Sequence, residues 1–155
     1  MEKIKMMPEE ISDKVLNINR IAKKIKGGQR IGFSALIAVG DRKGRVGLGY
    51  GKAADLRSAI EKANGKAKKN MFDVPLKDTT LPRRIQFKLG AAKVLLMPAP
   101  RGSGLIVGGI VRSILDLAGV KDASAKILGS DNPTTNAKAT IAALQALAKE
   151  DEKGK

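Results

Sequence analysis

The sequence has no cysteine, histidine or tryptophan, and its only aromatic residues are one tyrosine and three phenylalanines in 155 positions. Without thiols or imidazoles, the chain has no disulfides, no thiol nucleophile, no cysteine or histidine metal ligands and no usual general base near neutral pH. The serines therefore lack a partner base, and the scattered carboxylates form no recognisable catalytic set. We predict a protein that is not an enzyme and that binds no cofactor or metal.

Long apolar runs are absent as well. No stretch reaches the ~18 continuous apolar residues of a membrane helix, and the charged N-terminus has no apolar run of the kind that marks a secretion signal. Apolar residues make up 43% of the chain, which suffices for the core of one ordinary domain or two small ones. We expect a folded, cytoplasmic protein with no membrane partner.

Positive charge is concentrated in the middle of the chain. Residues 20–112 hold 21 Lys and Arg against 5 Asp and Glu, whereas residues 113–155 are balanced. Such a surplus attracts a polyanion, so nucleic acid is the first partner to expect. Proteins that bind single strands commonly stack bases on aromatic residues, but Phe33 and Phe87 alternate with apolar neighbours as core strand residues do. We therefore expect the basic surface to bind the phosphates of a nucleic acid and to recognise its shape.

The first half of the chain predicts three strands followed by a helix. Residues 31–50 form a hairpin pattern, with period-two alternation on both sides of turn residues at 40–44. An earlier strand from residue 14 changes phase near Arg20, which predicts a bulge there. From residue 53 to about residue 70 the period becomes helical, and the expected inward face consists of Leu56, Ile60, Ala63 and Ala67.

The second half predicts shorter elements after an aperiodic linker at residues 71–80, which places the domains at residues 1–76 and 77–155. In chain order, we expect strands at residues 85–89 and 94–97, a Gly-rich turn at 102–109, a helix at 110–119, a strand at 126–128 and a helix that Asn132 caps and Pro133 begins. The last helix is expected to turn Ala137, Ile141, Leu144 and Ala148 inward. Its charged tail from Glu150 is expected to fray.

Three groups of cations are candidates for nucleic-acid contact. The first surrounds a glycine turn that lets a phosphate backbone approach closely, the second lies at the predicted hairpin tip, and the third follows that hairpin into the helix. A solvated charged loop or helix face is the alternative for each group. The candidate residues are Arg20, Lys23, Lys24, Lys26, Gly27, Gly28, Arg30, Arg42, Lys43, Arg45, Lys52, Lys62, Lys66 and Lys69.

Two glycine-rich stretches invite comparison with phosphate-binding loops. Gly47, Gly49 and Gly51 alternate along a strand and do not bridge a strand to a helix, so close approach of another backbone explains them better than nucleotide binding. The loop at residues 101–104, followed by Gly108-Gly109 and a helix, is a better phosphate cradle because helix N-termini offer free amides. Its alternative is a loop that docks on a neighbouring protein.

These residues together resemble the family of bacterial small-subunit ribosomal protein five. The family's markers occur in order across about residues 14–148. They are Asn19-Arg20, Lys26-Gly27-Gly28, Val39-Gly40-Asp41, Gly44-Arg45-Val46-Gly47, Gly49-Tyr50-Gly51-Lys52-Ala53, Gly108-Gly109 with Arg112, Leu115 and Ala118-Gly119-Val120, Leu128-Gly129-Ser130, and Asn132-Pro133. Such a series is far more specific than any single glycine motif.

The resemblance implies an α+β fold. It consists of an N-terminal domain like a double-stranded-RNA-binding domain, with three strands and a helix, and a C-terminal β-α-β-α domain with a left-handed crossover. It also implies a structural constituent of the small ribosomal subunit that binds small-subunit ribosomal RNA, contributes to the mRNA entry region and touches ribosomal proteins four and eight. By the same resemblance, the contact with protein four is expected to influence translational accuracy, and the residues implied there are Arg101, Gly104 and Arg112.

Two other functions stay open at this point. The C-terminal fold of the family is shared with small-molecule kinases that carry a Gly-rich loop before a helix, but such a kinase needs acidic metal ligands near the phosphates, and none is apparent. A free-standing module that binds structured RNA would carry the same cations as a ribosomal component. Co-sedimentation with ribosomal particles would separate the two.

Overall fold

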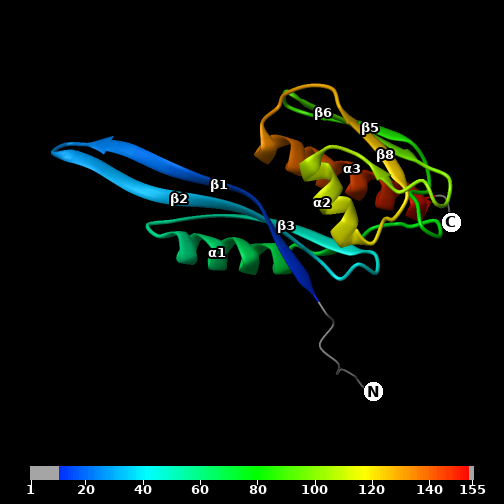
Figure 1. Ribbon diagram of the computed structural model, residues 1–155, viewed down its shortest axis with the longest axis horizontal. Coiled ribbons are helices and arrows are strands. Elements are labelled where there is room, and N and C mark those ends of the chain that lie inside the picture. The colour runs from blue at the N-terminus through cyan, green and yellow to red at the C-terminus, as the bar shows by residue number, and fades with distance from the viewer. Residues whose placement is uncertain (1–10, 154–155) are drawn as a thin grey trace, which may run out of the picture.

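The computed structural model describes residues 11–153, which form two four-stranded sheets and three helices. The first sheet is antiparallel, with the order β1-β2-β3-β4. Its strands are β1 at Ser12–Ile25, β2 at Gly28–Gly40, β3 at Arg45–Ala53 and β4 at Phe72–Asp73. Helix α1, Leu56–Lys69, covers one face of this sheet (Figure 1). The predicted arrangement of three strands and a helix is confirmed, with β4 as an addition.

The second unit is a mixed sheet with two helices, as the α+β prediction requires. Its strand order is β5-β6-β8-β7, and β7 runs parallel to β8 while the other pairs are antiparallel. The elements are β5 at Ile85–Leu89, β6 at Ala92–Pro98, β7 at Leu105–Ile106, α2 at Gly109–Ala118, β8 at Ala123–Ile127 and α3 at Pro133–Lys153. The left-handed crossover stays a prediction.

Helices α2 and α3 lie between the two sheets (Figure 1). Alternate residues of β2 therefore point into different cores, as the period of a strand requires. Leu36 and Ala38 join the large core that the second unit builds, whereas Ala35, Ile37 and Val39 pack toward α1. Because one core is shared across the predicted boundary after residue 76, the second unit holds the first sheet in place.

The glycines of β3 allow α1 to approach the sheet at backbone distance. A Cβ placed on Gly47, Gly49 or Gly51 would lie 2.2, 2.0 or 2.7 Å from a carbonyl oxygen of α1. The helix meets this bare strip with its smallest side chains, Ala59, Ala63 and Ala67, all fully buried. The close-approach interpretation of these glycines is confirmed. The predicted helix face was wrong at Leu56, which is exposed, because alanines occupy the contact.

Several element boundaries differ from the sequence prediction. The bulge in β1 lies between Val15 and Asn17 and not near Arg20. The first part of the expected linker pairs with β3 as β4, and the Gly-rich turn contains the short strand β7. Strand β8 begins at Ala123, earlier than residue 126. Pieces of two or three residues are too short to show a period, so neighbouring strands decide them.

Helix α3 begins where predicted, since the Asn132 side chain accepts a hydrogen bond from Thr134 N at 3.1 Å. Its buried set is wider than the predicted face, because α3 packs against both α2 and the second sheet. Ala139, Ala143 and Leu147 are buried in addition to Ala137 and Leu144. The helix continues past Glu150, which pairs with Arg83, to Lys153. The predicted fraying from Glu150 is therefore wrong as far as Lys153, and residues 154–155 lie outside the described residues.

Candidate nucleic-acid interface

Strands β1 and β2 extend beyond β3 as a two-stranded arm, residues 20–32. The pairing of β2 with β3 ends at Phe33, while β1 and β2 continue to pair as far as Ile25 and Gly28. Gly27 and Gly28 close the arm with φ of 96° and 155°, a backbone conformation that favours glycine. Figure 1 shows the arm projecting away from the rest of the molecule.

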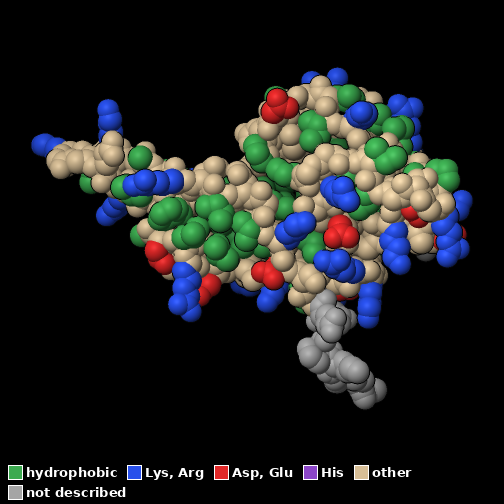
Figure 2. Space-filling model, in the orientation of Figure 1, with side chains coloured by type: hydrophobic (Ala, Val, Ile, Leu, Met, Phe, Trp, Pro, Cys, Tyr) green, Lys and Arg blue, Asp and Glu red, His purple; other side chains and the backbone are tan. Residues whose placement is uncertain are grey.

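The arm carries positive charge only. Residues 20–32 hold five cations and no carboxylate, and Figure 2 shows Lys and Arg side chains standing out along this projection. Lys23 and Arg30 lie directly opposite each other in the ladder, so their side chains share one face. Like charges in that position destabilise a strand pair. An arm built this way gains stability when an anion lies across both side chains.

The α1 cations have two roles available to them. Lys62 and Lys66 lie on the side of the helix that follows the edge of β3, where Lys62 Nζ donates to the carbonyl oxygen of Lys52 at 3.4 Å. Lys66 and Lys69 are in the last turn, where positive charge also complements the helix dipole. The side chains of Lys62, Lys66 and Lys69 are all exposed, so the same charges remain accessible to a polyanion.

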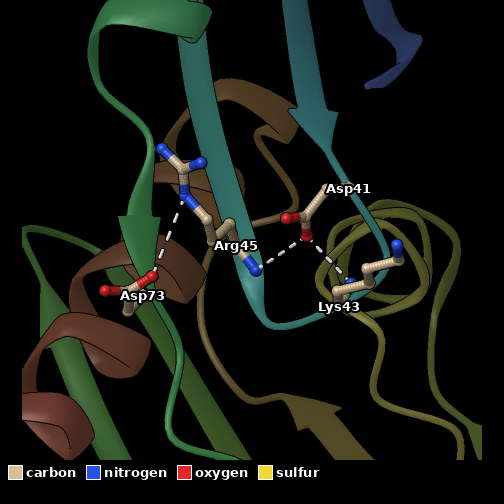
Figure 3. A network of polar contacts seen from close by, with 4 residues as sticks. All are labelled: Asp41, Lys43, Arg45 and Asp73. Carbon is tan, nitrogen blue, oxygen red and sulfur yellow. Dashed lines mark hydrogen bonds and ion pairs between the residues drawn. The ribbon is translucent and has the colours of Figure 1, made fainter. Parts of the chain in front are cut away.

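The hairpin turn between β2 and β3 is tied down from within. Asp41 Oδ1 accepts hydrogen bonds from the backbone N–H groups of Lys43 and Arg45 at 2.8 and 3.1 Å, and Arg45 Nε lies 3.8 Å from Asp73 Oδ1 (Figure 3). Arg42 Nη1 lies 3.5 Å from Asp116 Oδ2. The two arginines thus engage carboxylates of β4 and α2.

The same turn also docks on the end of α2. Arg42 N donates to Leu117 O at 2.9 Å, and Gly44 N donates to Ala118 O at 2.8 Å, so two carbonyls at the helix end find partners there. A Cβ on Gly119 would lie 2.5 Å from Arg42 O. Glycine is required at this position both by the contact and by its φ of 95°.

The candidate phosphate cradle at residues 101–104 is already occupied by a carboxylate of the chain. Asp122, which is 5% exposed, accepts hydrogen bonds from the N–H groups of Gly102 and Gly104 at 3.1 and 2.9 Å and from Thr79 Oγ1 at 2.6 Å. Hydrogen bonds from Thr79 and Gly104 hold the pKa of Asp122 below its usual value, against the opposing effect of burial. These amides are not free for a phosphate, which weakens the kinase hypothesis and favours the docking-loop interpretation.

Two models of known families match the chain across both units. Residues 11–75 match the description "Ribosomal protein S5, N-terminal domain", and residues 87–154 match "Ribosomal protein S5, C-terminal domain". The chain belongs to the ribosomal protein S5 family. A relative in Protochlamydia amoebophila (strain UWE25), the "Small ribosomal subunit protein uS5", is 50% identical over 143 residues, which cover 92% of this chain and 86% of that protein.

Membership of the ribosomal protein S5 family agrees with the fold class predicted from the sequence and with a structural, non-enzymatic protein. Within residues 11–153, no helix is long and apolar enough to cross a membrane. The predicted site residues do not form one cluster. The arm and Lys52 lie on the first sheet, whereas Arg101 and Arg112 are exposed on the second unit, before and after β7 in the sequence.

Three residues were missed by the sequence analysis. Asp122 was treated as a scattered carboxylate, and nothing in its sequence neighbourhood marks it. Ile106, which is 63% exposed on edge strand β7, lies between Gly104 and Arg112. Tyr50 was assigned to the apolar alternation of β3, but its ring lies within 5.8 Å of two lysine ammonium groups. Lys52 follows Tyr50 by two residues on the same strand, and this spacing could have indicated the first of these contacts.

Proposed function

We propose that this chain is a structural constituent of the small ribosomal subunit in the cytoplasm that holds small-subunit ribosomal RNA through phosphate contacts. The observation that supports this most directly is the arm, which carries like charges on opposite strands and has no carboxylate to balance them. RNA phosphates supply the missing negative charge. The relative's printed name, a small ribosomal subunit protein, supports the same function.

The RNA contact is proposed to be made by the candidate cations with the arm as its centre. Among residues 11–153, the ion pairs engage Arg42 and Arg45 but none of the arm cations. We therefore rank the arm and Lys52 above the hairpin turn as RNA ligands. Lys62, Lys66 and Lys69 extend the contact along α1.

The first experiment measures the affinity of the full chain for a small-subunit ribosomal RNA transcript at a series of salt concentrations. If about six phosphates are neutralised, log affinity falls against log salt with a slope of about −4 to −5. Replacing Lys23, Lys24 and Lys26 by Ala should make that slope less negative by about three units. An interaction that does not depend on salt would contradict the phosphate contact.

A matched control separates the position of the charges from their number. The exposed lysines Lys121, Lys126 and Lys149 belong to the second unit, and replacing them by Ala removes the same charge. Exposed charges contribute little to folding, so both triple variants should melt close to the wild type. If the control variant loses as much RNA affinity as the arm variant, net charge and not the arm explains the binding.

We further propose that the loop at residues 101–104 and the start of α2 face ribosomal protein four. Arg101 and Arg112 are exposed and suit bidentate pairing with carboxylates, and Ile106 of β7 adds an exposed apolar side chain to the same segment of the chain. Gly104 has a φ of 75° and an open side where another backbone can approach. Cross-linking from position 106 in assembled subunits should capture protein four, and capture of a different neighbour would contradict this assignment.

Protein eight and the mRNA entry region are proposed as further neighbours on the family resemblance alone. Cross-linking from one exposed position of each unit, in subunits with and without mRNA, would test both. An mRNA-dependent cross-link from the first unit and a protein-eight cross-link from the second are the expected results.

A further inference from the structure

A groove of about 520 Å³ separates the first sheet from α3, in the region where α1 ends. Apolar side chains of β2, β3 and α3 line part of it. The polar lining is Tyr50 from β3, Lys66 from α1 and Asn70, which caps that helix, and Lys138 and Gln145 from α3. None of the described lining residues is acidic. Both units therefore build one recess whose charge is entirely positive.

The ring of Tyr50 lies near two lysine ammonium groups at this groove. Lys52 Nζ and Lys138 Nζ each lie 5.8 Å from the centroid of its ring, and these lysines come from different units. A ring face attracts an ammonium group, so the tyrosine keeps two like charges near each other. An anion between them would relieve the remaining repulsion. A phosphate of RNA has the charge and the acceptor oxygens that this arrangement requires.

The edge of β3 beside the groove is not available to an added strand. Strand β4 pairs only with Arg45 and Val46, but the carbonyl oxygens farther along β3 are covered by side chains of α1. Asn70 Nδ2 donates to Leu48 O and Lys62 Nζ donates to Lys52 O, both at 3.4 Å. A peptide that extends the sheet would have to displace these contacts, which argues against such a partner.

The groove continues the basic face of the arm. Ladder partners share a face of a sheet, and Lys23 is opposite Arg30 while Lys52 is opposite Ser34. Because residues two apart on a strand also share a face, Arg30, Lys52 and Tyr50 lie on one side of the first sheet. This is the side on which α3 presents Lys138. Positive charge thus runs from the arm to the second unit without changing face.

We propose that this groove is a second phosphate-binding site for RNA, and that one RNA backbone is held both at the arm and between the two units. The inference rests on the proposed function, since it assumes that RNA lies on the arm. It adds two residues, Tyr50 and Lys138, and makes the second unit a direct RNA ligand.

The test compares Lys66→Gln, Lys138→Gln and the double variant with wild type, using the full chain and a small-subunit ribosomal RNA transcript. Each single variant should make the salt slope less negative by about one unit, which corresponds to about tenfold weaker binding near 0.1 M salt and little difference near 1 M. The double variant should make the slope less negative by about two units. The matched control is the double variant Lys121→Gln and Lys149→Gln, which should keep the wild-type slope.

Tyr50 is a positioning residue in this scheme, and its variants test that role. Tyr50→Leu removes the ring but no charge, so affinity should fall severalfold while the salt slope stays near wild type. Tyr50→Phe keeps the ring and should bind like wild type. Acetylation of wild-type lysines provides an independent readout, in which RNA should protect Lys66 and Lys138 but leave Lys149 reactive.

The outcomes separate this inference from the proposed function. If the arm variant loses affinity while the groove variants match their control, the groove inference is wrong and the proposed function stands. If Lys66 and Lys138 remain fully reactive in the complex, it is wrong as well. If neither arm nor groove variants change a salt-dependent binding, the proposed RNA surface itself is wrong.

Discussion

Replacing Gly119 by Ala should detach the hairpin turn from α2 and lower the stability of the whole chain. Gly119 has a φ of 95°, and the left-handed region costs a residue with a side chain about 1 kcal/mol. The new Cβ would also lie 2.5 Å from Arg42 O and 2.7 Å from the carbonyl carbon of Arg42. Overpacking against fixed backbone adds about 2 kcal/mol. We expect a loss of about 3 kcal/mol in the free energy of unfolding.

Such a loss is a large share of the ~5–15 kcal/mol that stabilises an ordinary domain. For a chain of this size it corresponds to a decrease in Tm of about 6–12 °C. Thermal unfolding followed by circular dichroism would measure it. The same substitution at Gly65 serves as a control, because a Cβ there meets nothing within 4 Å and the residue lies inside α1.

The control changes the sign of the effect. Alanine is a better helix former than glycine by roughly 0.5–1 kcal/mol, so Gly65→Ala should raise Tm by about 1–4 °C. Equal melting temperatures for Gly119→Ala and wild type would show that the turn can move away from α2 at no cost. The docking of the two units would then not depend on this contact.

Two further predictions concern the second unit. Because folding lowers the pKa of Asp122, its stabilising contribution is present above the unfolded pKa and is lost as pH falls through the lower folded value, so wild type should lose stability below about pH 4. Asp122→Asn should be less stable at neutral pH and show a shallower acid dependence in the same melting experiment; identical pH profiles would contradict the role of the carboxylate. In subunits assembled with Arg112→Ala or Gly104→Asp, the proposed contact with protein four should be weaker, so near-cognate misreading should rise while RNA attachment stays near normal. A loss of ~1.4 kcal/mol at that contact would change its equilibrium tenfold. Wild-type fidelity in both variants would contradict the assignment of this surface to protein four.

The sequence predicts those elements whose pattern is local. The hairpin at residues 31–50 is recovered because period-two alternation and the turn residues agree, and α2 ends at Gly119 as its glycine indicates. The inward face of α1 is displaced for a reason that lies in another element. The bare glycine strip of β3 admits alanines at backbone distance, so the larger Leu56 stays outside. A helix read alone favours its largest apolar residues as the core.

The candidate site was predicted where charge alone determines it. The arm cations are visible because no carboxylate interrupts residues 14–40, but the engagement of Arg42 by Asp116 joins residues from different units. The same limit hides the carboxylate in the glycine loop. Asp122 follows the loop by some 20 residues along the chain, and only the sheet pairing of β7 with β8 brings the two together.

The arm and its support answer different physical requirements. A two-stranded ribbon is marginal in water by itself, and opposed cations weaken it further. The first sheet compensates because one of its faces packs on α1 and the end of its other face farthest from the arm packs on α2 and α3. Only the arm, residues 20–32, has no such support. The charges that weaken the free arm are those that RNA phosphates would neutralise. The buried contacts are therefore concentrated at the junction of the two units, whereas the proposed RNA contact lies on the arm that projects from it.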